Sequence, residues 1–78
     1  MFTLYSKTGC PYCDKIEKVL KMKDLEYKKL LLNCEFNRTE FLEHFGEDAT
    51  FPRVLDDNGQ LIGGATETVA YLKKNGIL

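Results

Sequence analysis

The sequence predicts an α/β fold in which helices flank both faces of a four-stranded mixed sheet. Short strand-like segments at residues 2–6 and 27–33 are each followed by a stretch with helical spacing. An Asp-Asn-Gly turn signal at residues 57–59 divides residues 53–64 into two more short strands, and a third helical stretch follows. The predicted order of elements is therefore β-α-β-α-β-β-α.

The first strand is predicted at residues 2–6 and the first helix at residues 11–22. The segment FTLYS alternates large apolar with polar side chains, which is the pattern of a strand with one buried face. A proline opens the helix, where its missing N–H would have no partner in any case. Four helical residues share one face and are expected to be buried: Cys13, Ile16, Val19 and Leu20.

The second strand is predicted at residues 27–33. Because a helix connects it to the first strand, we expect the two strands to be parallel neighbours. Asn37 and Glu40 have the spacing of a capping box, with asparagine in place of serine or threonine, and so predict the start of the second helix. This helix is expected to stop at Gly46. Its predicted buried residues are Phe41, Leu42 and Phe45.

The hairpin at residues 53–64 is expected to complete the mixed sheet. Thr66 is predicted to cap the last helix, which should end before Gly76. The apolar residues of this helix are Val69, Ala70 and Leu72.

Length and composition indicate one small domain covering residues 1–78, with 44% hydrophobic residues. The 11 basic and 12 acidic residues give a net charge of −1, so the charge balance favours neither nucleic acid nor an anionic membrane as a partner. No apolar run approaches the ~18 residues of a membrane span, and the start of the chain lacks a signal-peptide core. We therefore expect a soluble, cytoplasmic protein.

Cys10 and Cys13 are the strongest candidates for chemistry. Cys10 falls where the first strand meets the first helix, and the free N–H groups and dipole of a helix start stabilise a thiolate. This position lowers the pKa of a cysteine below its usual value, and Lys7 can add to the effect. Cys13 lies three residues further on, facing inward, so we expect Cys10 to attack a disulfide and Cys13 to resolve the intermediate.

The cysteine pair has two other interpretations. Cys34 and His44 could complete a zinc site of three cysteines and one histidine, but nine residues separate them, more than the usual ligand spacing. A purely structural disulfide would restrict the unfolded chain little, because its loop is so short. We expect no metal, interpret His44 as a surface or half-buried helix residue, and interpret Cys34 as a small half-buried filler.

Three motifs together resemble the glutaredoxins over nearly the whole chain. They are CPYC at residues 10–13 after a strand, TFP at residues 50–52, and a glycine pair at residues 63–64 before the last helix. The resemblance implies a thioredoxin-like fold in which Pro52 follows a cis peptide bond. A cis bond would leave the backbone N–H and C=O of Phe51 free to pair with an extended peptide such as glutathione. A trans proline opening an edge strand is the alternative.

The resemblance also implies a set of glutathione-binding residues. They are Lys7, Tyr12, Arg38, Phe51, Pro52, Gly64, Ala65 and Thr66. In the family pattern Lys7 and Arg38 face the glycine carboxylate of glutathione, while Tyr12 flanks the reactive sulfur. Arg53, after the proline, is either a strand-edge surface residue or part of the rim that binds a partner.

The chain departs from the family pattern at two places. Glutaredoxins usually have Cys-Asp or Ser-Asp after the glycine pair, where this chain has Ala65 and Thr66. A charged contact with the α-amino group of glutathione is therefore absent, unless Glu67 replaces it. Phe51 stands where relatives have valine, which enlarges a side chain beside the thiol groove. These changes bear on glutathione affinity rather than on the type of reaction.

The predicted function is a glutathione-dependent thiol–disulfide oxidoreductase, a monomer that reduces protein disulfides and glutathionylated proteins. Glutathione is expected as the reducing co-substrate. One alternative is a small redoxin reduced by thioredoxin reductase. Another is a metal or iron–sulfur binding module that uses Cys10, and the CPYC sequence makes this less favoured by resemblance.

Overall fold

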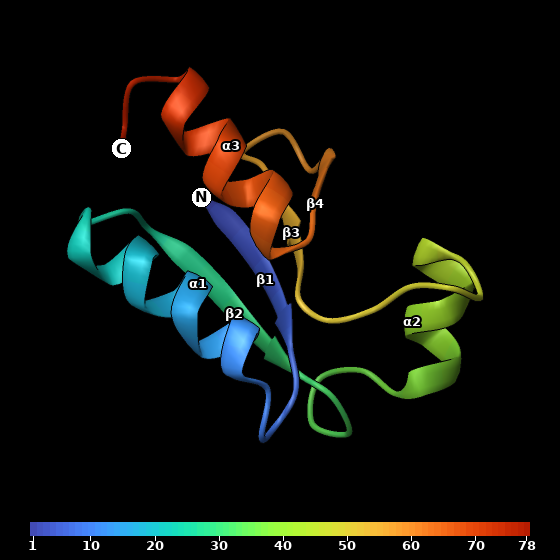
Figure 1. The fold of residues 1–78 in the computed structure, drawn as a ribbon. Coiled ribbons are helices and arrows are strands. Elements are labelled where there is room, and N and C mark those ends of the chain that lie inside the picture. Colours follow the sequence, from blue (N-terminus) through green and yellow to red (C-terminus); the bar gives the residue numbers. More distant parts are fainter.

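The computed structural model describes residues 1–78 and has the predicted order of elements (Figure 1). The elements are β1 (Phe2–Ser6), α1 (Pro11–Met22), β2 (Tyr27–Leu31), α2 (Arg38–Phe45), β3 (Arg53–Leu55), β4 (Leu61–Gly63) and α3 (Ala65–Lys74). The first strand and first helix have the bounds expected from the sequence, and β2 ends two residues earlier than predicted. No helix is both long enough and apolar enough to cross a membrane.

The four strands form one mixed sheet with the order β2-β1-β3-β4. β1 and β2 are parallel, with Phe2 opposite Tyr27 and Ser6 opposite Leu31. β3 is antiparallel to both β1 and β4, and its register with β4 shifts between Val54 and Leu55. The predicted mixed sheet, with a parallel first pair and a later hairpin, is confirmed.

The main core lies between the sheet and the two helices α1 and α3, which pack side by side (Figure 1). Its six buried side chains come from three strand positions and three helix positions: Phe2, Leu4, Ile16, Leu20, Val54 and Leu72. Burying an apolar side chain of this size stabilises a fold by roughly 1.5–3 kcal/mol. The alternation in β1 and the helical spacing in α1 thus both reflect this one core.

The opposite face of the sheet carries an aromatic cluster beneath α2. The ring of Tyr5 on β1 has its centroid 5.1 Å from that of Phe36 and 5.0 Å from that of Phe45. Phe41 is buried in α2 and stacks on Phe51 with centroids 4.2 Å apart. Helices therefore cover both faces of the sheet, as predicted, and the cluster connects α2 to the loop before β3.

The second helix begins with the predicted capping box. The backbone N–H of Glu40 donates to the Asn37 side chain at 2.8 Å, and the N–H of Asn37 donates to the Glu40 carboxylate at 3.0 Å. These two bonds satisfy helix-start donors that would otherwise lack partners. The helix ends at Gly46, as predicted, while Leu42 and Phe45 are half-buried rather than fully buried.

A polar contact fastens α1 to β2. The Tyr27 hydroxyl donates to Glu17 at 2.8 Å, and the Lys29 ammonium lies 3.1 Å from the same carboxylate. Burial raises the pKa of Glu17, but the hydrogen bonds from Tyr27 and Lys29 outweigh it, and the net pKa is lowered. Burial and the bond to Glu17 raise the pKa of Tyr27 to about 12.

Two predictions about single residues were wrong. Thr66 does not cap the last helix: the cap is Gly64, and Thr66 lies exposed inside the first turn. Cys34 is exposed rather than half-buried, because β2 ends at Leu31 and the chain turns away from the sheet before Cys34.

Candidate active site

The cysteine pair lies at the start of α1, where the chain leaves β1. Cys10 is the N-cap residue of the helix and Pro11 occupies its first turn, as the sequence predicted. Gly9, just before the cap, has a positive φ of 74°, a conformation that glycine adopts without strain. This turn brings the Cys10 sulfur over the first turn of the helix.

Cys10 and Cys13 form a disulfide, with their Cα atoms 5.2 Å apart. The backbone N–H of Cys13 also donates to the Cys10 sulfur across 3.2 Å. A donor aimed at that sulfur, together with the positive end of the helix dipole, favours the thiolate once the pair is reduced. Cys10 is 5% exposed and Cys13 is 1% exposed, so Cys13 is the less accessible of the two, as expected.

A cavity of about 270 Å³, which we call the basic cavity, lies beside the loop that leads to Cys10. Its lining residues are Lys7, Leu32, Arg38, Phe41, Leu42, Ala49, Thr50 and Phe51. It contains two cationic side chains and no carboxylate, and the Lys7 ammonium lies 5.6 Å from the centroid of the Phe51 ring. The structure therefore brings together Lys7, Arg38 and Phe51, in a setting that suits an anionic ligand.

The Phe51–Pro52 peptide bond is cis, as the family resemblance implied. Pro52 is buried, and the backbone N–H and C=O of Phe51 form no hydrogen bond within the chain. Backbone groups left free in this way can receive an extended peptide.

The glycine pair packs closely against the start of α3. Gly63 has a φ of +133°, and a Cβ atom added there would lie 2.7 Å from the Glu67 Cβ. The Gly64 N–H donates to the Glu67 carboxylate at 2.7 Å. A Cβ on Gly64 would also lie 3.5 Å from the Pro52 carbonyl oxygen, so this turn sits against the cis-proline loop.

Tyr12, Ala65 and Thr66 do not line the basic cavity. They line a separate groove between α1 and α3, which also contains Val69 from the last helix. Tyr12 is 62% exposed. The eight predicted binding residues thus divide into a group on the Lys7 side, a group on the Tyr12 side, and the glycine and proline positions Pro52 and Gly64.

The surroundings of Glu67 and Arg53 were not predicted from the sequence. Glu67 stands three residues after the cap Gly64, the spacing at which a carboxylate reaches back to the cap N–H, so the pattern was readable. Arg53 is half-buried, its Nε has no partner, and its guanidinium lies near Gly64. Its burial depends on the packing of the glycine turn, which no local pattern indicates.

The residues of the alternative zinc set are not assembled around the cysteine pair. No three histidine, cysteine or acidic side chains lie close enough to hold a metal ion. His44 is exposed on α2 and packs against Phe45, with ring centroids 4.4 Å apart.

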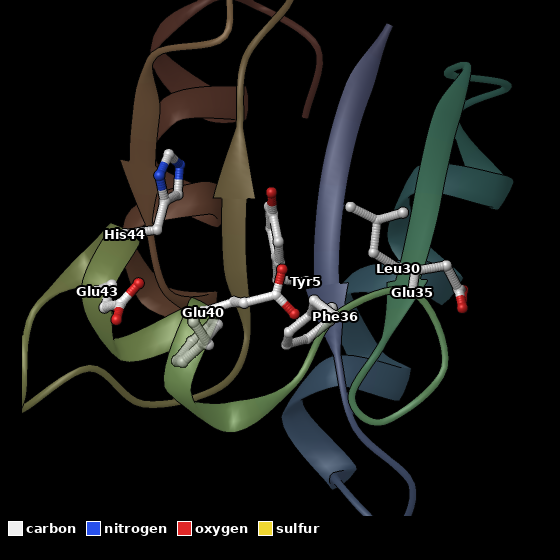
Figure 2. Close-up of a pocket in the computed structure, with 8 residues that line it drawn as sticks. Tyr5, Leu30, Glu35, Phe36, Glu40, Glu43 and His44 are labelled. Carbon is white, nitrogen blue, oxygen red and sulfur yellow. The ribbon is translucent and has the colours of Figure 1, made fainter.

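His44 instead borders a different cavity, of about 480 Å³, beside α2. Figure 2 shows the side chains that line this cavity. This acidic cavity is lined by three carboxylates, from Glu35, Glu40 and Glu43. Two of them bind backbone N–H groups: Glu35 accepts from Leu31 and Glu40 accepts from Asn37. Its charge is opposite to that of the basic cavity, so the two cavities suit different ligands.

The chain is similar in sequence to known proteins. A family model described as the glutathione S-transferase N-terminal domain matches residues 4–76. A glutaredoxin from Ricinus communis is 34% identical over 70 residues, which cover 86% of this chain and 68% of that protein. Across the curated relatives, all glutaredoxins, the chain spans 47% to 79% of their length.

Solved structures agree with this similarity. Reduced Escherichia coli glutaredoxin superposes with a TM-score of 0.78 at 25% identity, covering 99% of this chain and 98% of that one. A buckwheat glutaredoxin–glutathione complex gives a TM-score of 0.76 at 27% identity, covering 99% and 71% of the two chains. The predicted thioredoxin-like fold is confirmed.

Proposed function

Because this chain belongs to the glutaredoxin family, we propose that it is a glutathione-dependent thiol–disulfide oxidoreductase. The relatives and the Cys10–Cys13 pair support thiol–disulfide exchange as the reaction. The dependence on glutathione, the site residues and the steps below are our proposal. The observation that carries it is the position of the Cys10 sulfur, at a helix start and within 3.2 Å of the Cys13 N–H.

The reductive half of the reaction uses both cysteines. The Cys10 thiolate attacks one sulfur of a substrate disulfide, so that a mixed disulfide forms and the other substrate sulfur leaves as a thiolate. The Cys13 thiolate then attacks the Cys10 sulfur. This second exchange forms the Cys10–Cys13 disulfide and releases the second substrate thiolate, so two electrons pass from the protein to the substrate.

Glutathione restores the dithiol in two exchanges. A first glutathione thiolate attacks the Cys10 sulfur, which frees Cys13 and leaves glutathione joined to Cys10. A second glutathione thiolate attacks the sulfur of the bound glutathione, producing glutathione disulfide and the Cys10 thiolate. A glutathionylated protein needs Cys10 alone: Cys10 takes the glutathione, the protein thiol leaves, and a second glutathione completes the cycle.

The basic cavity is the proposed place of the glycine carboxylate of glutathione. Lys7 and Arg38 supply its positive charge, and the free N–H and C=O of Phe51 can pair with the extended tripeptide backbone. Pro52 shapes this strand-like edge, and Tyr12 flanks the sulfur. The buckwheat relative, whose structure contains glutathione, supports the choice of ligand.

The start of α3 is the weaker half of the proposed glutathione site. Gly64, Ala65 and Thr66 bring backbone groups to this end, but the Gly64 N–H is already bound to Glu67. The family has an aspartate at the position of Thr66. Glu67 follows one residue later, and its carboxylate can face the α-amino group of glutathione. We propose that glutathione binds here more weakly than in relatives that have the aspartate.

We extend the proposal to the setting of the protein. A catalytic disulfide that is repeatedly reduced requires a reducing compartment, and cytoplasm meets that requirement. The partners would be proteins with disulfides or glutathionylated cysteines, reduced by a monomer that needs no metal.

The test is the reduction of a glutathione mixed disulfide by the purified protein, supplied with glutathione, glutathione reductase and NADPH. We expect activity in the wild type, loss of activity in Cys10→Ser, and retained activity in Cys13→Ser. An inactive wild type would overturn the glutathione assignment, and coupling to thioredoxin reductase and NADPH would then be measured. An active Cys10→Ser variant would overturn the role of the nucleophile.

A further inference from the structure

We propose that the α1–α3 groove is a docking site for an apolar, acidic segment of a protein disulfide substrate. The groove is lined by Tyr12, Lys15, Ile16, Lys18, Val19, Met22, Ala65, Thr66 and Val69. The inference deepens the proposed function, since it names the kind of protein segment that the site would select.

The groove is large and mostly apolar. Its volume is about 520 Å³, and six of its nine lining residues are hydrophobic. Met22 is 69% exposed and Tyr12 is 62% exposed, at opposite ends of α1. Large apolar side chains left exposed around a groove mark a place where another surface can bury them.

Charge decides which partner fits. Lys15 and Lys18 are exposed on the groove, and no carboxylate lines it, although the chain as a whole has a net charge of −1. The acidic cavity in Figure 2 lies instead with α2, which covers the other face of the sheet. A segment with apolar residues between carboxylates would bury the apolar lining and pair with both lysines.

The groove begins at Tyr12, inside the CPYC motif. Tyr12 stands between Cys10 and Cys13 in the chain, and Ile16 lies one helical turn beyond Cys13 on the same face of α1. At the other wall, Ala65 follows directly after the cap Gly64. A segment bound in the groove would therefore place its neighbouring disulfide near Cys10.

The length of the groove suits a short extended segment. From Tyr12 to Met22 the helix rises about 15 Å, which an extended chain spans in about five residues. A second copy of this chain is a poorer occupant, because its own groove would bring two more lysines and no carboxylate to this one.

The first experiment compares two synthetic peptides that each carry one glutathionylated cysteine. One peptide has a flanking segment of leucine and glutamate, and the other has lysine in place of each glutamate. We expect the wild type to reduce the acidic peptide with about tenfold higher kcat/KM, and the preference to shrink as salt is added. Equal kcat/KM values for the two peptides would overturn the proposal.

Variants test whether the groove causes the preference. Lys15→Glu with Lys18→Glu should abolish it, whereas Lys28→Glu with Lys73→Glu makes the same change in net charge at exposed sites outside the groove. If both double variants lose the preference for the acidic peptide to the same extent, net charge alone causes the preference. That result would overturn the docking site.

The apolar part of the groove is tested in the same way. Met22→Ser should raise the KM for the acidic peptide severalfold, while the matched change Leu61→Ser, at a position 51% exposed on β4, should leave it unchanged. Equal effects of the two changes would overturn the apolar contribution.

Two controls separate this inference from the proposed function. All four variants should keep the wild-type rate on a small glutathione mixed disulfide, because none of the changed residues belongs to the cysteine pair or to the proposed glutathione site. Binding is also measured with a leucine–glutamate peptide that has serine in place of cysteine, by amide chemical-shift changes in a two-dimensional NMR spectrum. Shifts at Lys18, Val19 and Val69 would support docking even in an inactive protein, and shifts confined to Lys7 and Phe51 would overturn it.

Discussion

The backbone N–H of Cys13 donates to the sulfur of Cys10 across 3.2 Å. This contact uses a main-chain donor, so it survives replacement of the Cys13 side chain. It also connects the two halves of the motif, since Cys13, the proposed resolving residue, contacts the proposed nucleophile through its own N–H. The helix start thereby favours the charged form of Cys10.

We predict that the pKa of Cys10 remains below that of an ordinary cysteine in the double variant Cys13→Ser, Cys34→Ser. This variant has a single thiol, because the exposed Cys34 is also removed. The measurement is the rate of alkylation by iodoacetamide as a function of pH. The same variant in denaturant is the reference, and an identical midpoint in the folded and unfolded protein would contradict the prediction.

Lys7→Gln and Arg38→Gln should each raise the KM for glutathione about two- to fivefold, because each removes one positive charge from the basic cavity. The effect should fall in high salt, since both side chains are exposed. Steady-state kinetics with glutathione as the varied substrate measures it. Lys28→Gln, at an exposed position on β2, is the matched control, and an equal rise in KM there would argue against a specific carboxylate contact.

Gly63→Ala should destabilise the fold by roughly 1–3 kcal/mol. Its φ of +133° disfavours any side chain, and the added Cβ would meet the Glu67 Cβ at 2.7 Å. Gly59→Ala is the comparison, because it also has a positive φ but no atom within 4 Å of the added Cβ. Urea unfolding of both variants measures the difference, and equal losses of stability would show that the close packing on Glu67 does not matter.

The fold was predictable wherever the pattern was local. The alternation in residues 2–6, Pro11 at a helix start and the pair Asn37 and Glu40 each determine structure within one element. The cap of α3 was assigned wrongly to Thr66, because a threonine before an apolar stretch resembles an N-cap. The Glu67 carboxylate, bound to the Gly64 N–H, instead marks the start of that helix two residues earlier.

The candidate site was predictable in its chemistry but not in its layout. The spacing of Cys10 and Cys13 at a strand–helix junction was enough to predict a redox pair. By contrast, the division of the predicted binding residues between the basic cavity and the α1–α3 groove depends on how α2 and α3 pack against opposite faces of the sheet. The exposure of Cys34 likewise depends on where β2 ends. A sequence pattern predicts the end of such an element only to within a few residues.

The contact between Glu17 and Tyr27 should make stability depend on alkaline pH. The pKa of Tyr27 is raised from 10.0 to about 12 in the folded protein, so the folded state holds this proton more tightly than the unfolded state. Its contribution to stability is therefore complete below pH 10 and is lost as the pH rises through about 12. The lowered pKa of Glu17 acts in the opposite range, where stability is lost as the pH falls below 4.5.

We predict that one of the four tyrosines titrates at about 12 in the folded protein, and that Glu17→Gln lowers the pKa of this tyrosine. The chemical shift of the ring carbon that carries the hydroxyl, followed by NMR as the pH is raised, assigns each titration to one tyrosine. Tyr27→Phe should remove this titration together with the part of the alkaline loss of stability that it causes. If Tyr27→Phe and the wild type lose stability equally between pH 10 and about 12, Tyr27 does not govern the alkaline limit, and the contact between α1 and β2 has no part in it.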